Sequence, residues 1–259
     1  MHGPVSRRSN VAARCPRCRL HQALCVCQLI PRVETRTRLT LVIHHREDDK
    51  TTNTGRLASE CLPNSQVLVR GHAHVAVDPL ADNGAAQPVL LFPHEDARPL
   101  GEFAESAAPV HLIVPDGNWR QAAKVRARVP GLSQVPCATL PAGAPTLYRL
   151  RSEPHEGGLA TMEAIARAFG ILEGPHVQQA LEQLFLVMVE RTLWSRGQLA
   201  AEHVHGGVPR GNPAPRAKAA RLTASRPHRP LVGSVVALAW RRPTGPRFPA
   251  CEPAARRAR

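Results

Sequence analysis

The chain has 259 residues, and 43% of them are hydrophobic, which is enough to bury a packed core. No stretch approaches the ~20 consecutive apolar residues that a membrane-spanning helix needs, and the apolar run at 231–240 is interrupted by Gly233 and Ser234. No apolar segment follows the basic N-terminal residues, so we predict no secretory signal, no membrane contact and a cytoplasmic location.

The formal net charge of +14 is concentrated near the C-terminus. Residues 201–259 hold 12 Lys and Arg against 2 acidic residues, and 9 of the 25 prolines. Such an Arg/Pro-rich segment is either a phosphate-binding arm or a solvated tail without a partner. The charge alone therefore indicates a polyanion as partner and nothing more specific.

Four of the seven cysteines lie within thirteen residues near the N-terminus, whereas Cys61, Cys137 and Cys251 are isolated. In a chain without an export signal, such a cluster indicates metal binding rather than disulfides. Four thiolates can bind Zn²⁺ tetrahedrally, and a site whose ligands are all protein side chains is structural. We predict a structural zinc ion, with free structural thiols as the alternative; the ligands would be Cys15, Cys18, Cys25 and Cys27.

The remaining elements alternate between strand and helix. Apolar runs predict strands at 38–44, 66–70, 88–92 and 110–115, with shorter candidates at 135–140 and 147–151. Helices are predicted at 53–60, 119–128, 161–169 and 176–194. Gly170 is predicted to end the third of these helices. The class is therefore α/β with a mostly parallel sheet.

The tetrapeptide Asp116-Gly-Asn-Trp119 follows the strand predicted at 110–115. Open α/β sheets bind ligands at the carboxyl ends of their strands. A carboxylate, a glycine backbone, an amide and an indole could act there as base, backbone donor, hydrogen-bonding group and stacking surface. A polar turn with Trp119 anchored in the core is the alternative.

A third motif joins Tyr148-Arg-Leu-Arg151 to Glu156-Gly-Gly-Leu-Ala-Thr-Met-Glu163. Glycines before a helix let backbone N–H groups approach an anion, such as the carboxylate of a methionine moiety. A plain helix-capping loop is the alternative. His44 and His45, next to a strand end, are either polar ligands or structural residues.

Six separated motifs, in this order, resemble the DTW-domain proteins over residues 15–197. They are the cysteine cluster, His44-His-Arg-Glu47, Asn53-Thr-Gly-Arg56, Leu91-Phe-Pro-His-Glu-Asp96, Pro115-Asp-Gly-Asn-Trp119, and the motif of residues 148–166 with its glycines. The resemblance implies an enzyme that transfers the 3-amino-3-carboxypropyl group of S-adenosyl-L-methionine to N3 of a tRNA uridine. It also implies a SPOUT-like (α/β-knot) fold.

The resemblance implies roles for individual residues. Catalysis would fall to Asp116, as base or nucleobase-orienting group, with Asn118 and Trp119. The residues expected to bind S-adenosylmethionine are Phe92, Pro93, Asp116, Gly117, Arg149, Arg151, Gly157, Gly158 and Thr161. One departure is visible, because Asn118 stands where the family signature has Thr.

We expect a zinc-binding segment at 10–35, a catalytic domain at 36–205 and a mostly irregular tail at 206–259. The expected partner is tRNA, with no obligate protein partner. Two other functions stay open. The first is a SPOUT-type RNA methyltransferase that uses the same cofactor, and the second is a non-catalytic zinc-containing RNA-binding protein.

Overall fold

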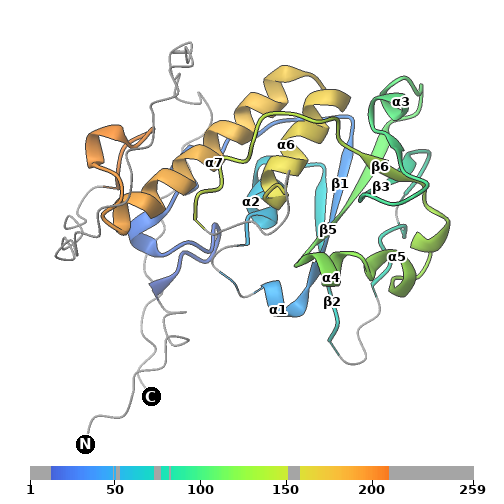
Figure 1. The fold of residues 1–259 in the computed structure, drawn as a ribbon, viewed down its shortest axis with the longest axis horizontal. Coiled ribbons are helices and arrows are strands. Elements are labelled where there is room, and N and C mark those ends of the chain that lie inside the picture. Colours follow the sequence, from blue (N-terminus) through green and yellow to red (C-terminus); the bar gives the residue numbers. More distant parts are fainter. Residues whose placement is uncertain are drawn as a thin grey trace, which may run out of the picture.

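The computed structural model describes residues 13–48, 50, 53–72, 77–81, 83–150 and 158–209. Its centre is a six-stranded sheet in the order β2-β1-β5-β3-β6-β4, in which every pairing is parallel (Figure 1). The strands are β1 Arg38–His44, β2 Ser65–Arg70, β3 Gln87–Leu91, β4 Arg98–Pro99, β5 Val110–Asp116 and β6 Cys137–Thr139. The predicted α/β class with a parallel sheet is confirmed.

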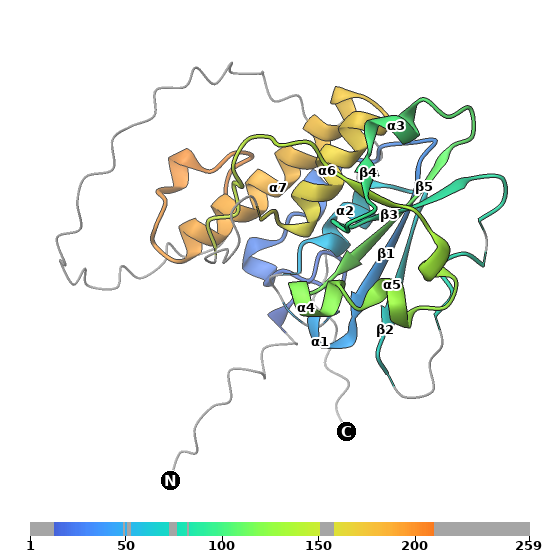
Figure 2. The ribbon, with the colours of Figure 1, turned by 45° about the vertical axis from the view of Figure 1, so that its right-hand side comes forward.

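The helices cover the sheet unequally. The α-helices are α1 His45–Asp48, α2 Gly55–Cys61, α3 Gly101–Ala104, α4 Trp119–Ala122, α5 Val125–Arg128, α6 Thr161–Leu172 and α7 Pro175–Ser195. Short 3-10 turns lie at η2 Gln22–Leu24, η3 Cys27–Leu29, η4 Leu132–Gln134 and η5 Ala201–His203. Helices α6 and α7 lie side by side, and α5 lies at the other side of the sheet (Figures 1 and 2).

The apolar residues of the central strands point alternately to the two faces, as the period of a β-strand requires. Leu112 and Val114 of β5 belong to the large core that includes α2, α6 and α7. Ile113, between them, packs in a smaller core with α5 and η4. Because both faces are covered, β5 is buried over nearly its whole length, and its last residue, Asp116, emerges at the carboxyl edge of the sheet.

The N-terminal segment and residues 205–207 are both attached to α7. The buried Arg191 guanidinium donates hydrogen bonds to the carbonyl oxygens of Cys25 and Gly207. Glu190 accepts hydrogen bonds from the backbone N and the ring Nδ1 of His205. None of the helices in the described ranges has the length and apolar composition that a membrane span requires.

Two predicted elements were wrong. Residues 147–150 form no strand. Tyr148 is buried, and its ring centroid lies 5.8 Å from that of Phe185. The backbone N of Leu147 donates a hydrogen bond of 2.7 Å to the Glu163 carboxylate. The apolar alternation there reflects packing of a loop over α6 and α7. Gly170 does not stop α6, which continues to Leu172.

Gly170 has a packing role instead. A Cβ at this position would lie 3.0 Å from Cβ of Gln178, so a side chain here would make a tight contact with α7. The basic helix predicted at 119–128 is divided into α4 and α5. The apolar run at 231–240 and the rest of the proposed tail from 210 onward lie outside the described residues.

Candidate active site and metal centre

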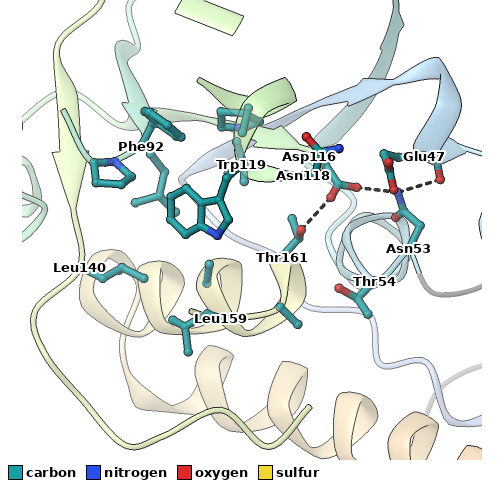
Figure 3. A pocket seen from close by; sticks show the side chains of 18 of the residues that line it. Glu47, Asn53, Thr54, Phe92, Asp116, Asn118, Trp119, Leu140, Leu159 and Thr161 are labelled. Carbon is teal, nitrogen blue, oxygen red and sulfur yellow. Dashed lines mark hydrogen bonds between the residues drawn. The ribbon is translucent and has the colours of Figure 1, made fainter. Parts of the chain in front are cut away.

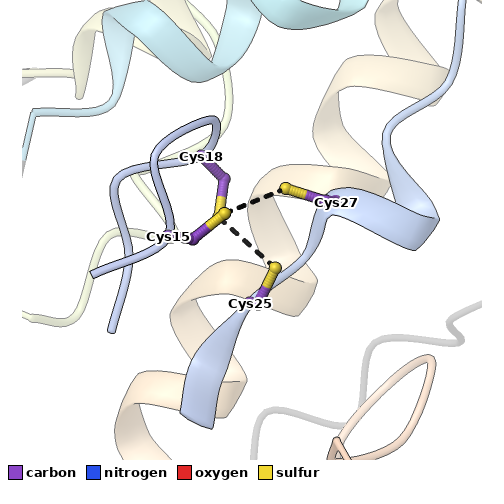
Figure 4. Close-up of side chains that lie close together, drawn as sticks. All are labelled: Cys15, Cys18, Cys25 and Cys27. Atoms are coloured by element: carbon purple, nitrogen blue, oxygen red, sulfur yellow. Dashed lines mark hydrogen bonds between the residues drawn. The ribbon is translucent and has the colours of Figure 1, made fainter. Parts of the chain in front are cut away.

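The four clustered cysteines point their sulfur atoms toward one another (Figure 4). Cys15 Sγ lies 3.4 Å from Cys27 Sγ, and Cys18 Sγ lies 3.8 Å from Cys25 Sγ. All four sulfurs lie within 4.8 Å of one another. A tetrahedron with Zn–S bonds of about 2.3 Å has S···S edges of about 3.8 Å, whereas a disulfide needs about 2.05 Å. The cluster therefore has the geometry of a four-thiolate metal site.

The chemistry of the cluster also suits a cation. Hydrogen bonds with Cys25 and Cys27 lower the pKa of Cys18 to about 4, while hydrogen bonds with Cys18 and Cys25 raise the pKa of Cys27. A bound metal ion would favour all four thiolates. Cys61 is buried away from the cluster and donates to the Leu57 carbonyl, and burial raises its pKa.

A cavity of about 460 Å³ opens at the carboxyl edge of the sheet. Its lining comes from the ends of β3, β5 and β6, from α4, and from the start of α6 (Figure 3). The residues around it are Glu47, Lys50, Asn53, Thr54, Leu91, Phe92, Pro93, Val114, Pro115, Asp116, Gly117, Asn118, Trp119, Ala122, Ala138, Thr139, Leu140, Leu159, Ala160, Thr161 and Ala164.

Asp116 is the carboxylate at the floor of this cavity, and only 7% of its surface is exposed. Its Oδ1 accepts a hydrogen bond of 2.7 Å from the Thr161 hydroxyl, and its Oδ2 accepts one of 2.6 Å from Nδ2 of Asn53 (Figure 3). A Cβ on Gly55 would lie 2.9 Å from Oδ2, so glycine is needed at the start of α2. Two donors from two helix starts thus fix the orientation of the carboxylate.

Asn53 and Thr54 join this site to the helices around it. The Asn53 side chain uses its Oδ1 to accept from the backbone N of Arg56, at the start of α2. The Thr54 hydroxyl accepts from the backbone N of Met162, at the start of α6. No role was predicted for these two residues from the sequence, although they belong to the motif at residues 53–56.

The Asn118 side chain caps the N-terminus of α4. Its Oδ1 accepts a hydrogen bond of 2.9 Å from the backbone N of Gln121, and Oε1 of Gln121 accepts one of 2.8 Å from the backbone N of Asn118. This reciprocal pair is a capping box. A Cβ on Gly117 would lie 2.9 Å from the same Oε1, so the glycine makes room for the cap.

Trp119 forms the outer apolar wall of the cavity. The side chain is 43% exposed, although it is a large aromatic residue. Its ring centroid lies 6.1 Å from that of Phe92, with the planes tilted by 54°. In Figure 3 both rings lie on the opposite side of Asp116 from Glu47. The cavity therefore offers an aromatic surface at one side and polar groups at the other.

Glu47 and Lys50 complete the polar side. Lys50 Nζ donates to Oε1 of Glu47 at 2.7 Å, and Glu47 is 8% exposed. With Asp116 this gives two carboxylates and one ammonium group around the cavity. Such a set can orient a ligand that carries both a cationic and an anionic group, next to a ring that can stack on a base.

The structure brings most of the predicted site residues together. Phe92, Pro93, Asp116, Gly117, Asn118, Trp119 and Thr161 all line the cavity. Gly158 is buried and Arg149 is exposed, and neither is among the lining residues. Arg151 and Gly157 lie outside the described residues. The catalytic and cofactor-binding roles of all these residues stay predictions.

Backbone amides at the start of α6 are already engaged. The Ala160 N–H donates to the Glu163 carboxylate at 2.9 Å, and the Met162 N–H donates to Thr54. The same Glu163 carboxylate accepts from the Thr146 hydroxyl at 2.5 Å. Glu163 therefore caps the helix and fastens the preceding loop, which is the helix-capping alternative considered for this motif.

Comparison with known proteins gives a consistent result. The DTW domain model matches residues 12–193. The chain is 29% identical to a Drosophila melanogaster protein named tRNA-uridine aminocarboxypropyltransferase 2, across 69% of this chain and 72% of that protein. It is 27% identical to the Macaca fascicularis protein of the same name, across 69% of this chain and 61% of that protein.

A plant protein is similar to the same degree. The Arabidopsis thaliana tRNA-uridine aminocarboxypropyltransferase A is 27% identical, across 68% of this chain and 79% of that protein. No solved structure matches the chain significantly.

Proposed function

The chain belongs to the DTW domain family, and from this premise we propose that it is a tRNA-uridine aminocarboxypropyltransferase that uses S-adenosyl-L-methionine. The observation that carries the proposal is the Asp116 carboxylate, fixed by Asn53 and Thr161 at the floor of a cavity whose outer wall is the exposed Trp119 ring. The named activity of three relatives supports it.

The reaction is an alkyl transfer. Uridine N3 attacks the methylene carbon of the methionyl chain that is bonded to sulfur. An N–C bond forms while the C–S bond breaks, methylthioadenosine leaves with the bonding electrons, and N3 gives up its proton. A positioned base contributes typically ~10²–10⁴-fold to such a step, and most of the remaining acceleration comes from orientation.

Asp116 is the group we assign to the N3 proton, either as the base or as the anchor of the base edge. Its oxygens accept hydrogen bonds from Asn53 and Thr161, which fix the orientation of the carboxylate, and the residue lines the cavity where a ligand would lie. Trp119 and Phe92 are the surfaces for stacking on the uracil or the adenine ring. Thr161 acts on Asp116 and so positions the reacting group.

We assign Zn²⁺ to the cysteine cluster, because four thiolates at tetrahedral spacing with no open position suit a structural zinc ion. The hydrogen bond from Arg191 to the Cys25 carbonyl supports a role in holding the N-terminal segment on α7. Kinship to the SPOUT-like enzymes is part of the proposal and is supported by the all-parallel sheet. We expect the enzyme to act in the cytoplasm without an obligate protein partner.

Product analysis tests the proposal against its rivals. The protein is incubated with S-adenosylmethionine and unmodified tRNA, and both the small product and the tRNA nucleosides are identified by mass spectrometry. We expect methylthioadenosine together with aminocarboxypropyluridine. S-adenosylhomocysteine with a methylated nucleoside would identify a methyltransferase instead, and a protein that binds tRNA but not S-adenosylmethionine would be a non-catalytic binder.

A further inference from the structure

A basic surface lies beside the cavity, on the other side of α4. Between Asp116 and Glu153 the chain has six Lys and Arg residues and no acidic residue. Three of the six, Arg120, Lys124 and Arg128, are exposed on or next to α4 and α5. Within the described part of the chain none of these three forms an ion pair. This surface therefore presents positive charge that is not paired with a carboxylate of the described residues.

Arg70, the last residue of β2, is the least exposed member of this surface. Only 8% of its surface is exposed. Its Nη2 donates a hydrogen bond of 2.6 Å to the Gln121 carbonyl of α4. Its buried Nε has no hydrogen-bond partner among the described residues. Burial and the nearby charge of Arg128 lower the pKa of Arg70. Buried guanidinium groups are normally paired with an anion, and none of the described residues supplies one.

Three histidines continue the surface at the ends of β1 and β2. The ring centroids of His44 and His45 are 4.6 Å apart, and those of His45 and His72 are 5.0 Å apart. Gly71, with φ +92°, turns the chain after β2 so that His72 reaches this group. Burial and the charges of Arg70, His45 and Arg46 lower the pKa of His44, while Glu47 opposes them. The arginines therefore lie close enough to the histidines for their charges to affect the pKa of His44.

We propose that one part of this surface, made of Arg70, Arg128, the exposed Arg46 and the three histidines, binds backbone phosphates of the RNA next to the nucleotide that enters the cavity. The inference rests on the proposed function. Helix α4 separates the two sites, because Trp119 and Ala122 line the cavity while the Gln121 carbonyl receives Arg70. A strand that places its base against Trp119 would carry the adjoining phosphates across this helix.

Arginine suits the task because its planar guanidinium makes two hydrogen bonds to one phosphate. Imidazole N–H groups add short-range donors to a phosphate oxygen. Phosphate contacts position a nucleic acid without reading its sequence. The surface would therefore set the register of the RNA and leave the choice of base to the cavity.

Two exposed arginines allow a test in the full-length protein without disturbing the buried Arg70. We would compare Arg46→Ala, Arg128→Ala and the double variant with the control Arg36→Ala. Arg36 is exposed and lies two residues before β1, at the amino end of the sheet, so each single variant loses the same charge as the control. The tRNA dissociation constant is measured across a salt series for each variant, and the dissociation constant of S-adenosylmethionine is measured alongside.

Each lost phosphate contact should reduce the slope of log affinity against log salt by about 0.7–0.9. We expect this loss in each single variant, roughly twice the loss in the double variant, and a raised KM for tRNA with unchanged kcat and unchanged S-adenosylmethionine affinity. Slopes equal to that of Arg36→Ala would overturn the proposal. These slopes are read from binding alone, so a wild-type protein that forms no methylthioadenosine would refute the proposed function and leave the phosphate test intact.

Discussion

The sulfur atoms of the cysteine cluster all lie within 4.8 Å of one another, whereas the Asp116 carboxylate faces a cavity of about 460 Å³. The cluster directs its four ligand atoms inward, and a metal ion bound there would have no position for a further ligand. The Asp116 carboxylate accepts hydrogen bonds from Asn53 and Thr161 and also lines the cavity.

This difference separates structural polar groups from functional ones. A closed set directs its donors and acceptors at one another or at a bound metal ion, and we expect it to hold the fold together. An open set is held in one orientation by fixed neighbours and also faces a cavity, and we expect it to act on a ligand. The comparison predicts which substitutions reduce stability and which reduce turnover.

The largest effect is expected for Cys25→Ser. A structural zinc ion contributes an apparent binding free energy of roughly 10–16 kcal/mol in small zinc domains, so loss of one thiolate should release the metal and loosen the N-terminal segment from α7. Metal analysis and thermal unfolding measure this. The control is Cys61→Ser, which should keep the metal because Cys61 is outside the cluster. A wild-type protein without metal, with a melting temperature unaffected by Cys25→Ser, would refute the zinc site.

Asp116→Asn should lower turnover by about 10²-fold or more, as expected for the loss of a general base. Folding and cofactor affinity should change little. The new amide can accept from Asn53 and donate to the Thr161 hydroxyl, which is able to reverse its role. Single-turnover transfer from labelled S-adenosylmethionine to unmodified tRNA is the measurement. Near wild-type turnover would show that Asp116 is neither base nor anchor.

Asn53→Ala should have a smaller effect on the same step. It removes one of the two donors that orient Asp116, and a hydrogen bond to a charged group contributes about 1.5–3 kcal/mol. We expect kcat to fall about tenfold with KM for tRNA nearly unchanged. Asn53→Asp should lower kcat further, because two carboxylates would then repel each other. If both variants lowered only the melting temperature and left kcat intact, Asn53 would be purely structural.

The two sites also differ in how far the sequence predicts them. The cysteine cluster is contained in thirteen consecutive residues, so spacing alone indicated its ligands. The partners of Asp116 lie 63 and 45 residues away along the chain, and no local pattern connects them. Asp116 and Thr161 were expected through the family resemblance, whereas Asn53 required the parallel pairing of β1 and β5 to bring α2 to the cavity.

Secondary structure was predictable where one physical cause dominated. Buried parallel strands such as β1 and β5 are continuous apolar runs, so their positions were predicted correctly. Gly170 was misread because a glycine at a close helix crossing looks, in sequence, like a glycine that ends a helix. Residues 147–150 were misread because their alternation comes from contacts with α6 and α7, which are distant in sequence.

His111 provides a second closed polar group, on the same strand as Asp116. Its Nε2 lies 2.6 Å from the Thr40 hydroxyl and its Nδ1 lies 2.5 Å from Oδ1 of Asn83. Burial, together with the charge of Arg38, lowers its pKa from 6.5 to about 4. The unfolded chain therefore takes up a proton first as the pH falls, and the free energy of unfolding should decrease between about pH 6.5 and pH 4.

Thermal unfolding of the wild type and of His111→Gln across this pH range measures the effect. The melting temperature of the wild type should fall further on acidification than that of the variant, since the variant lacks the titrating group. Parallel curves for the two proteins would show that His111 contributes nothing to the acid sensitivity. The difference between the curves is what matters, because carboxylates elsewhere titrate equally in both.

The smallest effect is expected for Asn118→Thr, which restores the residue of the family signature. In the structure Asn118 belongs to the closed class of polar residues, because its Oδ1 accepts a hydrogen bond from the backbone N of Gln121 and so caps α4. Thr is also an N-cap residue, only slightly less favourable than Asn, whereas Ala at an N-cap costs about 1 kcal/mol. We therefore expect Asn118→Thr to keep turnover within about twofold and to leave the melting temperature nearly unchanged.

Asn118→Ala is the matched control for the cap. A loss of about 1 kcal/mol lowers the melting temperature of a domain of this size by roughly 2–4 °C, and α4 would then hold Trp119 less firmly at the cavity. If the Thr variant instead changed turnover more than about tenfold at an unchanged melting temperature, residue 118 would contact the reacting groups. That outcome would move Asn118 from the closed to the open class of polar residues, and its difference from the family signature would then affect catalysis directly.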